Sequence, residues 1–171
     1  MTLPESHPVE GLADEIAEAL RAPDSPAREY AHRVYVLEDL SLLPEEAQAP
    51  FYGVRIAASG VTSEQADRIG QAWTVEVWAF QDLRAPTLGG ASVGLKPGAP
   101  AARAGVLRLL WAAFRTLRGR GFGQWGILRY AGETETQAVV VGGEGEKRLA
   151  GWVRRGLRFI YKHGCDFEPE E

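Results

Sequence analysis

The sequence predicts a single α+β domain, in which a mostly antiparallel sheet is flanked by an N-terminal helix and one longer helix. Apolar residues recur at helical spacing in residues 8–22 and 101–118, and at strand spacing in several other segments. Most of the predicted strands follow one another with short connections, which favours antiparallel pairing. A chain of 171 residues, of which 45% are apolar, suits one domain with a buried core, so we expect residues 1–171 to fold as one unit.

The first helix is expected within residues 8–22. Its apolar positions lie three or four residues apart, and acidic residues near its start suit the helix dipole. The apolar positions are Val9, Leu12, Ile16 and Leu20. The stretch "PDSP" ends this helix, and the β-forming composition of residues 32–40 and 50–59 predicts two strands. Thr62 and Gln65 then have the spacing of a capping box, which predicts a short helix over residues 62–70.

Residues 71–82 form the clearest predicted strand. Alternate positions divide the side chains into two faces, and both faces carry aromatic residues. One face comprises Trp73, Val75, Val77 and Ala79, and the other comprises Thr74, Glu76, Trp78 and Phe80. We therefore expect this strand in the middle of the sheet, covered on both sides.

The longer helix is expected after an extended loop. Residues 83–100 contain three prolines and four glycines, a composition typical of a loop, and their length indicates a functional or disordered segment. Residues 101–118 then have the helical period. The predicted core stripe is Val106, Leu110, Ala113 and Leu117, widened by Leu107, Trp111 and Phe114.

Three further strands are predicted in the last third of the chain. Residues 124–131 and 134–141 are close enough to form a hairpin around Gly132. Residues 151–163 alternate between an apolar face and a mostly basic face, as expected of a last strand. The acidic residues 164–171 are expected to be a frayed tail.

The stretch "GFGQWG" places Gly121, Gly123 and Gly126 at the spacing of a dinucleotide-binding fingerprint. That fingerprint works where a strand leads into a glycine-rich turn that opens a helix, because the helix N-terminus then faces the phosphates. Here the order is reversed, since the predicted helix ends near Arg118 and a strand follows the glycines. We interpret the stretch as a helix C-cap, at Gly119 or Gly121, followed by a turn.

No group of residues has the spacing of a catalytic or metal site. His163, Cys165 and Asp166 lie close together, but the further ligands that zinc requires have no candidates at usable spacing. Nothing in that segment would orient a nucleophile and its base, and the sequence contains neither a nucleophile elbow nor a P-loop. We therefore expect no enzymatic activity, no cofactor and no metal.

Glu76 is the one acidic residue within a strongly apolar strand. A carboxyl group between Val75 and Val77 either has a raised pKa or pairs with an arginine of a neighbouring strand. We favour pairing, with Arg55 or Arg158 as the partner.

The net charge of −4 hides an uneven distribution along the chain. Residues 1–50 contain 11 acidic and 3 basic side chains, whereas residues 103–162 contain 12 basic and 4 acidic ones. Such a division is typical of a basic surface for nucleic acid, of head-to-tail self-association, or of charges spread over an ordinary surface.

The composition is typical of an intracellular protein, and we expect no contact with a membrane. The N-terminal residues lack the features of a signal peptide, no segment reaches the roughly 18 apolar residues of a membrane span, and the single cysteine has no internal disulfide partner. The chain has no asparagine, one methionine, 16 arginines and 3 lysines. This bias fits either a thermophile or a GC-rich genome.

The order of elements resembles that of the tail-terminator (tail-completion) proteins of long-tailed bacteriophages. The resemblance rests on the strands "RVYVLED", "PFYGVRIAAS" and "TVEVWAF", the helix "AGVLRLLWAAF" and the closing strand "RRGLRFIYKH". It covers most of the chain and concerns the order and character of the segments. The extended loop of residues 83–100 and the connection "EDLSLLPEEAQ" depart from the family pattern.

This resemblance implies an α+β structural protein of the virion tail, made in the host cytoplasm, that forms a hexameric ring. The ring ends the tail tube and joins it to the head-tail connector protein, and DNA passes through its lumen without sequence-specific contacts. The arginines implied to face a neighbouring subunit or the lumen are Arg118, Arg120, Arg154, Arg155 and Arg158. The residues implied to contact a partner from the extended loop are Leu88, Val93, Leu95 and Lys96. The alternative is a small nucleic-acid-binding protein that uses its basic face.

Overall fold

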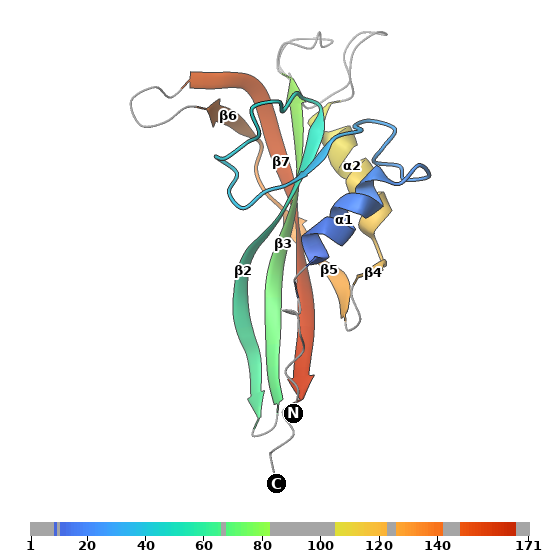
Figure 1. The fold of residues 1–171 in the computed structure, drawn as a ribbon, viewed down its shortest axis with the longest axis vertical. Helices are drawn as coiled ribbons and strands as arrows, with labels where there is room; N and C mark the ends of the chain where they lie inside the picture. The colour runs from blue at the N-terminus through green and yellow to red at the C-terminus, as the bar shows by residue number, and fades with distance from the viewer. Residues whose placement is uncertain are drawn as a thin grey trace.

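The computed structural model describes Val9 and residues 11–65, 68–82, 105–122, 126–141 and 148–166. These residues form two helices and a seven-stranded mixed sheet, in agreement with the predicted α+β class. The helices α1 (Leu12–Arg21) and α2 (Val106–Leu117) lie beside each other on one side of the sheet (Figure 1). Neither of the described helices is long and apolar enough to cross a bilayer.

Three long strands form the centre of the sheet. The strands are β1 (Val34–Val36), β2 (Phe51–Gln65), β3 (Arg68–Asp82), β4 (Gly121–Phe122), β5 (Gly126–Glu133), β6 (Gln137–Val141) and β7 (Arg148–Asp166). Their order is β1-β2-β3-β7-β5-β4, and β6 also pairs with β7. β1 runs parallel to β2, and the other pairs among the described strands are antiparallel. The lower ends of β2, β3 and β7 extend past the helices as a three-stranded ribbon (Figure 1).

β3 lies between β2 and β7 and is covered on both faces near the level of the helices, as its sequence predicts. Val77 and Ala79 belong to the larger core, which the sheet forms with α1 and α2. Trp78 and Phe80, which point to the opposite face, belong to a second core beneath residues 37–49. Burying each large apolar side chain in these cores stabilises the fold by about 1.5–3 kcal/mol.

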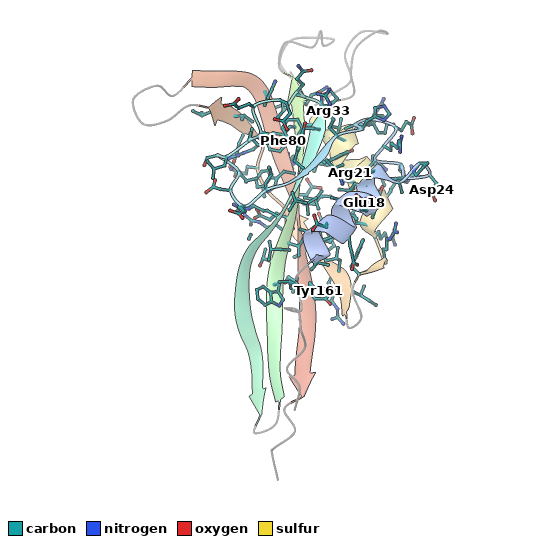
Figure 2. All side chains as sticks on the ribbon, viewed as in Figure 1. Glu18, Arg21, Asp24, Arg33, Phe80 and Tyr161 are labelled. Atoms are coloured by element: carbon teal, nitrogen blue, oxygen red, sulfur yellow. The ribbon has the colours of Figure 1, made fainter. Side chains whose placement is uncertain are left out.

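Polar contacts attach α1 to the sheet. Arg21, in the last turn of α1, forms a salt bridge with Glu18 at 2.7 Å and donates a hydrogen bond to the carbonyl oxygen of Val34 in β1. Figure 2 shows Glu18 and Arg21 close together on α1, and Phe80 and Tyr161 on the sheet. Ile16 and Leu20, two of the predicted apolar positions, are fully buried on the opposite side of the helix.

The predicted short helix over residues 62–70 is wrong. β2 continues to Gln65 and β3 begins at Arg68, with Gln65 opposite Arg68 in the antiparallel register. The capping-box spacing is a local signal, and pairing along two long strands, reinforced by β7 on the far side of β3, satisfies many more backbone groups than one short helix.

The predicted hairpin around Gly132 is also wrong, because β5 and β6 both pair with β7. The two strands follow one another along the same edge of β7, and the chain passes from one to the other at Thr134. The backbone N–H of Thr134 donates to the carbonyl oxygen of Gly156, and the N–H of Gly156 donates to Oγ1 of Thr134, both at 2.8 Å.

The expected frayed tail over residues 164–171 is wrong for its first three residues. β7 continues to Asp166, which lies opposite Arg68 of β3, so residues 164–166 are paired in the sheet. Residues 167–171 lie outside the described residues.

Candidate interaction surfaces

The candidate arginines on β7 do not share one face of the sheet. They are Arg154, Arg155 and Arg158. Successive residues of a strand point to opposite faces. Arg154 and Arg158 point away from the helices, and Arg155 points to the side that carries them. The alternation of the sequence already indicates this difference. Arg155 lies two and four residues before the buried Leu157 and Phe159, so all three point to the same face of the strand.

Glu76 is the centre of the polar group on the helix-free face. Its side chain is 6% exposed, and Arg55 Nε and Trp78 Nε1 donate to its Oε2 at 2.8 and 2.9 Å. Arg158 Nε donates to Oε1 at 3.3 Å. Burial alone would raise the pKa of Glu76, but these hydrogen bonds together hold its pKa below the ordinary value. The predicted pairing of Glu76 is confirmed, with both candidate arginines as partners.

Arg154 attaches the segment of residues 37–49 to the sheet. Its Cζ lies 5.2 Å from the ring centroid of Trp78, and its Nη1 donates to the carbonyl oxygen of Leu40 at 3.1 Å. Its Nε also donates to the side chain of Gln137 at 3.2 Å. Burial, together with the positive charge of Arg55, lowers the pKa of Arg154. These contacts give Arg154 a structural role within the subunit.

Arg155 forms its contacts at the junction of β5 and β6. Its guanidinium lies 2.9 Å from the carboxylate of Glu133, and its Nη1 donates to Oγ1 of Thr136 at 3.2 Å. Arg154, Arg155 and Arg158 therefore have partners in their own chain, and part of their charge is balanced there.

Arg118 and Arg120 lie where α2 ends, both exposed to solvent. Gly119 between them has a φ of 69°, the left-handed conformation that glycine adopts at a helix C-terminus, as the sequence predicts. Arg120 lies over the ring of Phe122 at 5.6 Å and lines a surface depression of about 420 Å³ together with Asp14 and Glu18 of α1. A helix C-terminus precedes this stretch, so the glycines do not form a phosphate-binding turn of the dinucleotide type.

Several candidate residues lie where the structure supplies no side-chain geometry. The predicted partner-contact residues of the extended loop, Leu88, Val93, Leu95 and Lys96, lie outside the described residues. His163 and Cys165 are in β7, opposite Gln71 and Ile69 of β3, and only their backbone is described. Among the described residues, no group of three histidine, cysteine or acidic side chains is placed to hold a metal ion.

An apolar pocket between α2 and β5 is the main feature that the sequence did not predict. The pocket has a volume of about 180 Å³, and six of its seven lining residues are apolar or aromatic. The lining comprises Leu107, Leu110, Trp111, Phe114, Tyr130, Leu157 and the acidic Glu133. Trp111 stacks on Phe114 at 5.5 Å, and Phe114 meets the ring of Tyr130 edge-on at 5.1 Å. Trp111 is 58% exposed and Tyr130 is 50% exposed.

The predicted core stripe of α2 is therefore too wide. Leu110, Ala113 and Leu117 are buried, whereas Leu107 and Trp111 are exposed. Nine of the twelve residues of α2 are apolar, which exceeds what one sheet-facing stripe can bury. That excess is the sequence signal from which the second surface of α2 can be found.

Another exposed apolar residue, Leu42, lies on the opposite side of the sheet, in the acidic connection of residues 37–46. Leu42 is 70% exposed, and its neighbours Leu37 and Leu40 are buried and anchor the connection. The exposed acidic residues of this connection are Glu38, Asp39, Glu45 and Glu46. Single exposed apolar residues are common on protein surfaces, so exposure alone does not identify Leu42 as a contact residue. Such a role requires a surface that can bind it.

Comparison of the sequence with models of known protein families gives no match, and comparison with curated proteins gives no relative.

Proposed function

We propose that this chain is a ring-forming structural subunit, of the kind that ends the tail tube of a long-tailed bacteriophage and joins it to the head-tail connector. The observation that carries the proposal is a sheet with unpaired edges on both sides within the described residues. Among the described residues, β1 pairs with β2 only at residues 52–54, so no described strand covers the outer edge of β2 from Arg55 onward. At the opposite side, β4 pairs with β5 only at residues 126–127.

Unpaired strand edges favour association between subunits. Each edge presents backbone N–H and carbonyl groups that another strand can pair with, and monomeric proteins usually protect such edges. Two different edges on opposite sides of one subunit suit a head-to-tail contact, which closes into a ring when the rotation between subunits allows it. The tail-terminator resemblance supplies the biological setting for such a ring.

The partners in this proposal follow from that setting. The chain binds copies of itself in a ring of six, the tube protein on one face and the connector protein on the other, with DNA in the lumen. Exposed Arg118 and Arg120 suit the lumen or a neighbouring subunit, because they are basic and lie at the end of α2. A subunit of this kind works through binding alone, as part of the virion tail, and requires neither catalytic residues nor a cofactor.

The alternative, a nucleic-acid-binding protein with a basic face, has less support. A phosphate-binding surface requires cations on one side of the molecule, aligned with the backbone of the nucleic acid. Arg155 points away from Arg154 and Arg158, and each of the three has a partner within the chain.

Particle mass in solution tests the proposal. We expect sedimentation velocity across a concentration series to give one large species, and negative-stain images of the same sample to show closed rings. Binding of duplex DNA should be weak and without a sequence preference. A monomer at every concentration, together with DNA affinity that falls steeply as salt rises, would overturn the proposal in favour of the alternative.

A further inference from the structure

We propose that the pocket between α2 and β5 binds the exposed Leu42 of a neighbouring copy of this chain. The inference rests on the proposed ring and specifies the contact that builds it. The pocket supplies a partly enclosed apolar surface made of rigid rings, and Leu42 supplies an apolar side chain that projects from the fold. Moving both surfaces out of water favours association by about 25 cal/mol for each Å² of apolar area buried.

The connection that carries Leu42 has a defined conformation in the subunit. The Oδ1 atom of Asp39 accepts hydrogen bonds from the backbone N–H and the hydroxyl of Ser41, both at 2.7 Å. The N–H of Leu42 donates to the carbonyl oxygen of Asp39 at 3.1 Å, and Arg154 holds the carbonyl oxygen of Leu40. Because this turn is already ordered, little conformational entropy is lost when Leu42 enters a pocket.

The side chains that form the pocket are also held in place by contacts within the subunit. The ring of Tyr130 packs between those of Phe114 and the buried Phe159. Its centroid lies 5.1 Å from the centroid of Phe114 and 6.0 Å from that of Phe159, so the aromatic wall of the pocket continues into the core. Aromatic side chains have few rotatable bonds, and they are enriched among the residues that dominate the energy of interfaces. Exposed Trp111, at the rim, is the residue that we expect to contribute most to the contact.

Most of the charges around the two surfaces are complementary. The exception is Glu133 in the pocket lining, whose charge is balanced by its salt bridge with Arg155 at 2.9 Å. Leu42 lies among the exposed carboxylates of residues 38–46. On α2, Arg108 and Arg115 lie three residues before and four residues after Trp111, so both share its side of the helix, and both are exposed. An acidic rim that meets a basic rim fixes the orientation of the contact and disfavours pairing of two identical surfaces.

The positions of the two surfaces make the contact head-to-tail. Residues 37–49 pack on the face of the sheet that carries Trp78 and Phe80, and α2 packs on the opposite face. In Figure 1 the connection lies to the left of the crossing strands and α2 lies to the right. A subunit with a projecting residue on one side and its pocket on the other makes the same contact with each neighbour, as ring closure requires.

Crosslinking between single-cysteine chains tests this contact. Cys165→Ser first removes the native thiol from both chains. One chain then carries Leu42→Cys. A second chain, with a different tag, carries Leu107→Cys in the pocket lining. Both new cysteines replace exposed side chains, so both variants should fold. The chains are co-expressed and treated with a short bis-maleimide, which alkylates one thiol of each partner.

We expect the mixed pair to give roughly tenfold more covalent dimer than a control pair in which Glu29→Cys replaces Leu42→Cys, because a specific contact raises the effective concentration of the two thiols. Adding Trp111→Ala to the Leu107→Cys chain should return the yield to the control level. Leu107→Cys alone should not form dimers above the control.

Dimers of Leu107→Cys alone in the same yield as the mixed pair would show a symmetric contact and overturn the inference. A yield at the control level would also overturn it. If rings are nevertheless present in the images of the wild-type protein, the proposed function stands and only the contact is wrong. If the wild-type protein forms no rings either, both fail.

Discussion

The guanidinium of Arg154 lies over the indole of Trp78, with Cζ 5.2 Å from the ring centroid. The same guanidinium donates to the carbonyl oxygen of Leu40, so one side chain joins β7, β3 and the acidic connection. Arg154, which the tail-terminator resemblance implies to face a neighbouring subunit or the lumen, therefore has a structural role within its own subunit.

We expect Arg154→Ala to lower the free energy of unfolding by about 1–2 kcal/mol, because it removes a cation–π contact and a charged hydrogen bond. Arg154→Lys keeps the charge but loses the planar stacking, so its loss should be smaller. Urea unfolding of both variants measures the difference. Equal stability of Arg154→Ala and the wild-type protein would contradict the structural role.

Glu76→Gln tests the buried carboxylate. The amide can still accept a hydrogen bond from Trp78, but Arg55 and Arg158 lose their counter-charge, so we expect a loss of about 1–3 kcal/mol at pH 7. The exposed Glu46→Gln is the matched control and should change stability by less than about 0.5 kcal/mol.

The effect of Glu76 should depend on pH in a defined direction. The pKa of Glu76 in the folded protein lies below its ordinary value of 4.5, so the ionised carboxylate stabilises the fold above that pH. This stabilisation is lost as the pH falls through the lowered pKa. The difference in unfolding free energy between the wild-type protein and Glu76→Gln should therefore narrow as the pH falls below 4.5. A difference that stays constant from neutral to acidic pH would contradict this role of Glu76.

Gly156→Ala tests the close packing of β7 against Trp78. A Cβ atom at position 156 would lie 2.8 Å from Cδ2 and 2.9 Å from Cε2 of Trp78, so the buried indole must move. We expect a loss of about 1–3 kcal/mol, as is usual for overpacking of a core. Thermal unfolding of a double-mutant cycle with Trp78→Leu checks the cause, because the same glycine substitution should cost much less in the Trp78→Leu background.

Sequence patterns predicted those features of the fold that depend on periodicity. The alternation from Trp73 to Phe80 correctly gave a central strand with two covered faces, and the lone acid within it correctly gave the pairing of Glu76. Local motifs were less reliable, because the partners of a strand depend on residues distant in the chain. The capping-box spacing at Thr62 predicts a short helix, but these residues pair with β3 instead. The glycine at position 132 predicts a hairpin, but the strands on both sides of it pair with β7.

The candidate contact could be predicted only in part. The charge division between the two ends of the chain already indicated head-to-tail association as one interpretation. Trp111 continues the apolar pattern of its helix, which predicts a core position, and only the packing of α2 on the sheet shows which apolar positions remain outside the core. Leu42 had no sequence signal, since its exposure depends on the anchoring of Leu37, Leu40 and the Arg154 contact.

In the proposed ring, Leu42 of one subunit binds the pocket between α2 and β5 of the next, so two different surfaces of this chain meet. Leu42→Asp removes the projecting apolar residue, and Trp111→Glu places a charge in the rim of the pocket, so each variant keeps one intact surface. The most direct measurement is the particle mass of each variant alone and of their equimolar mixture. We expect each variant alone to be a monomer and the mixture to form dimers that contain one copy of each. Ring-sized particles from either variant alone, or a mixture that stays monomeric, would contradict it.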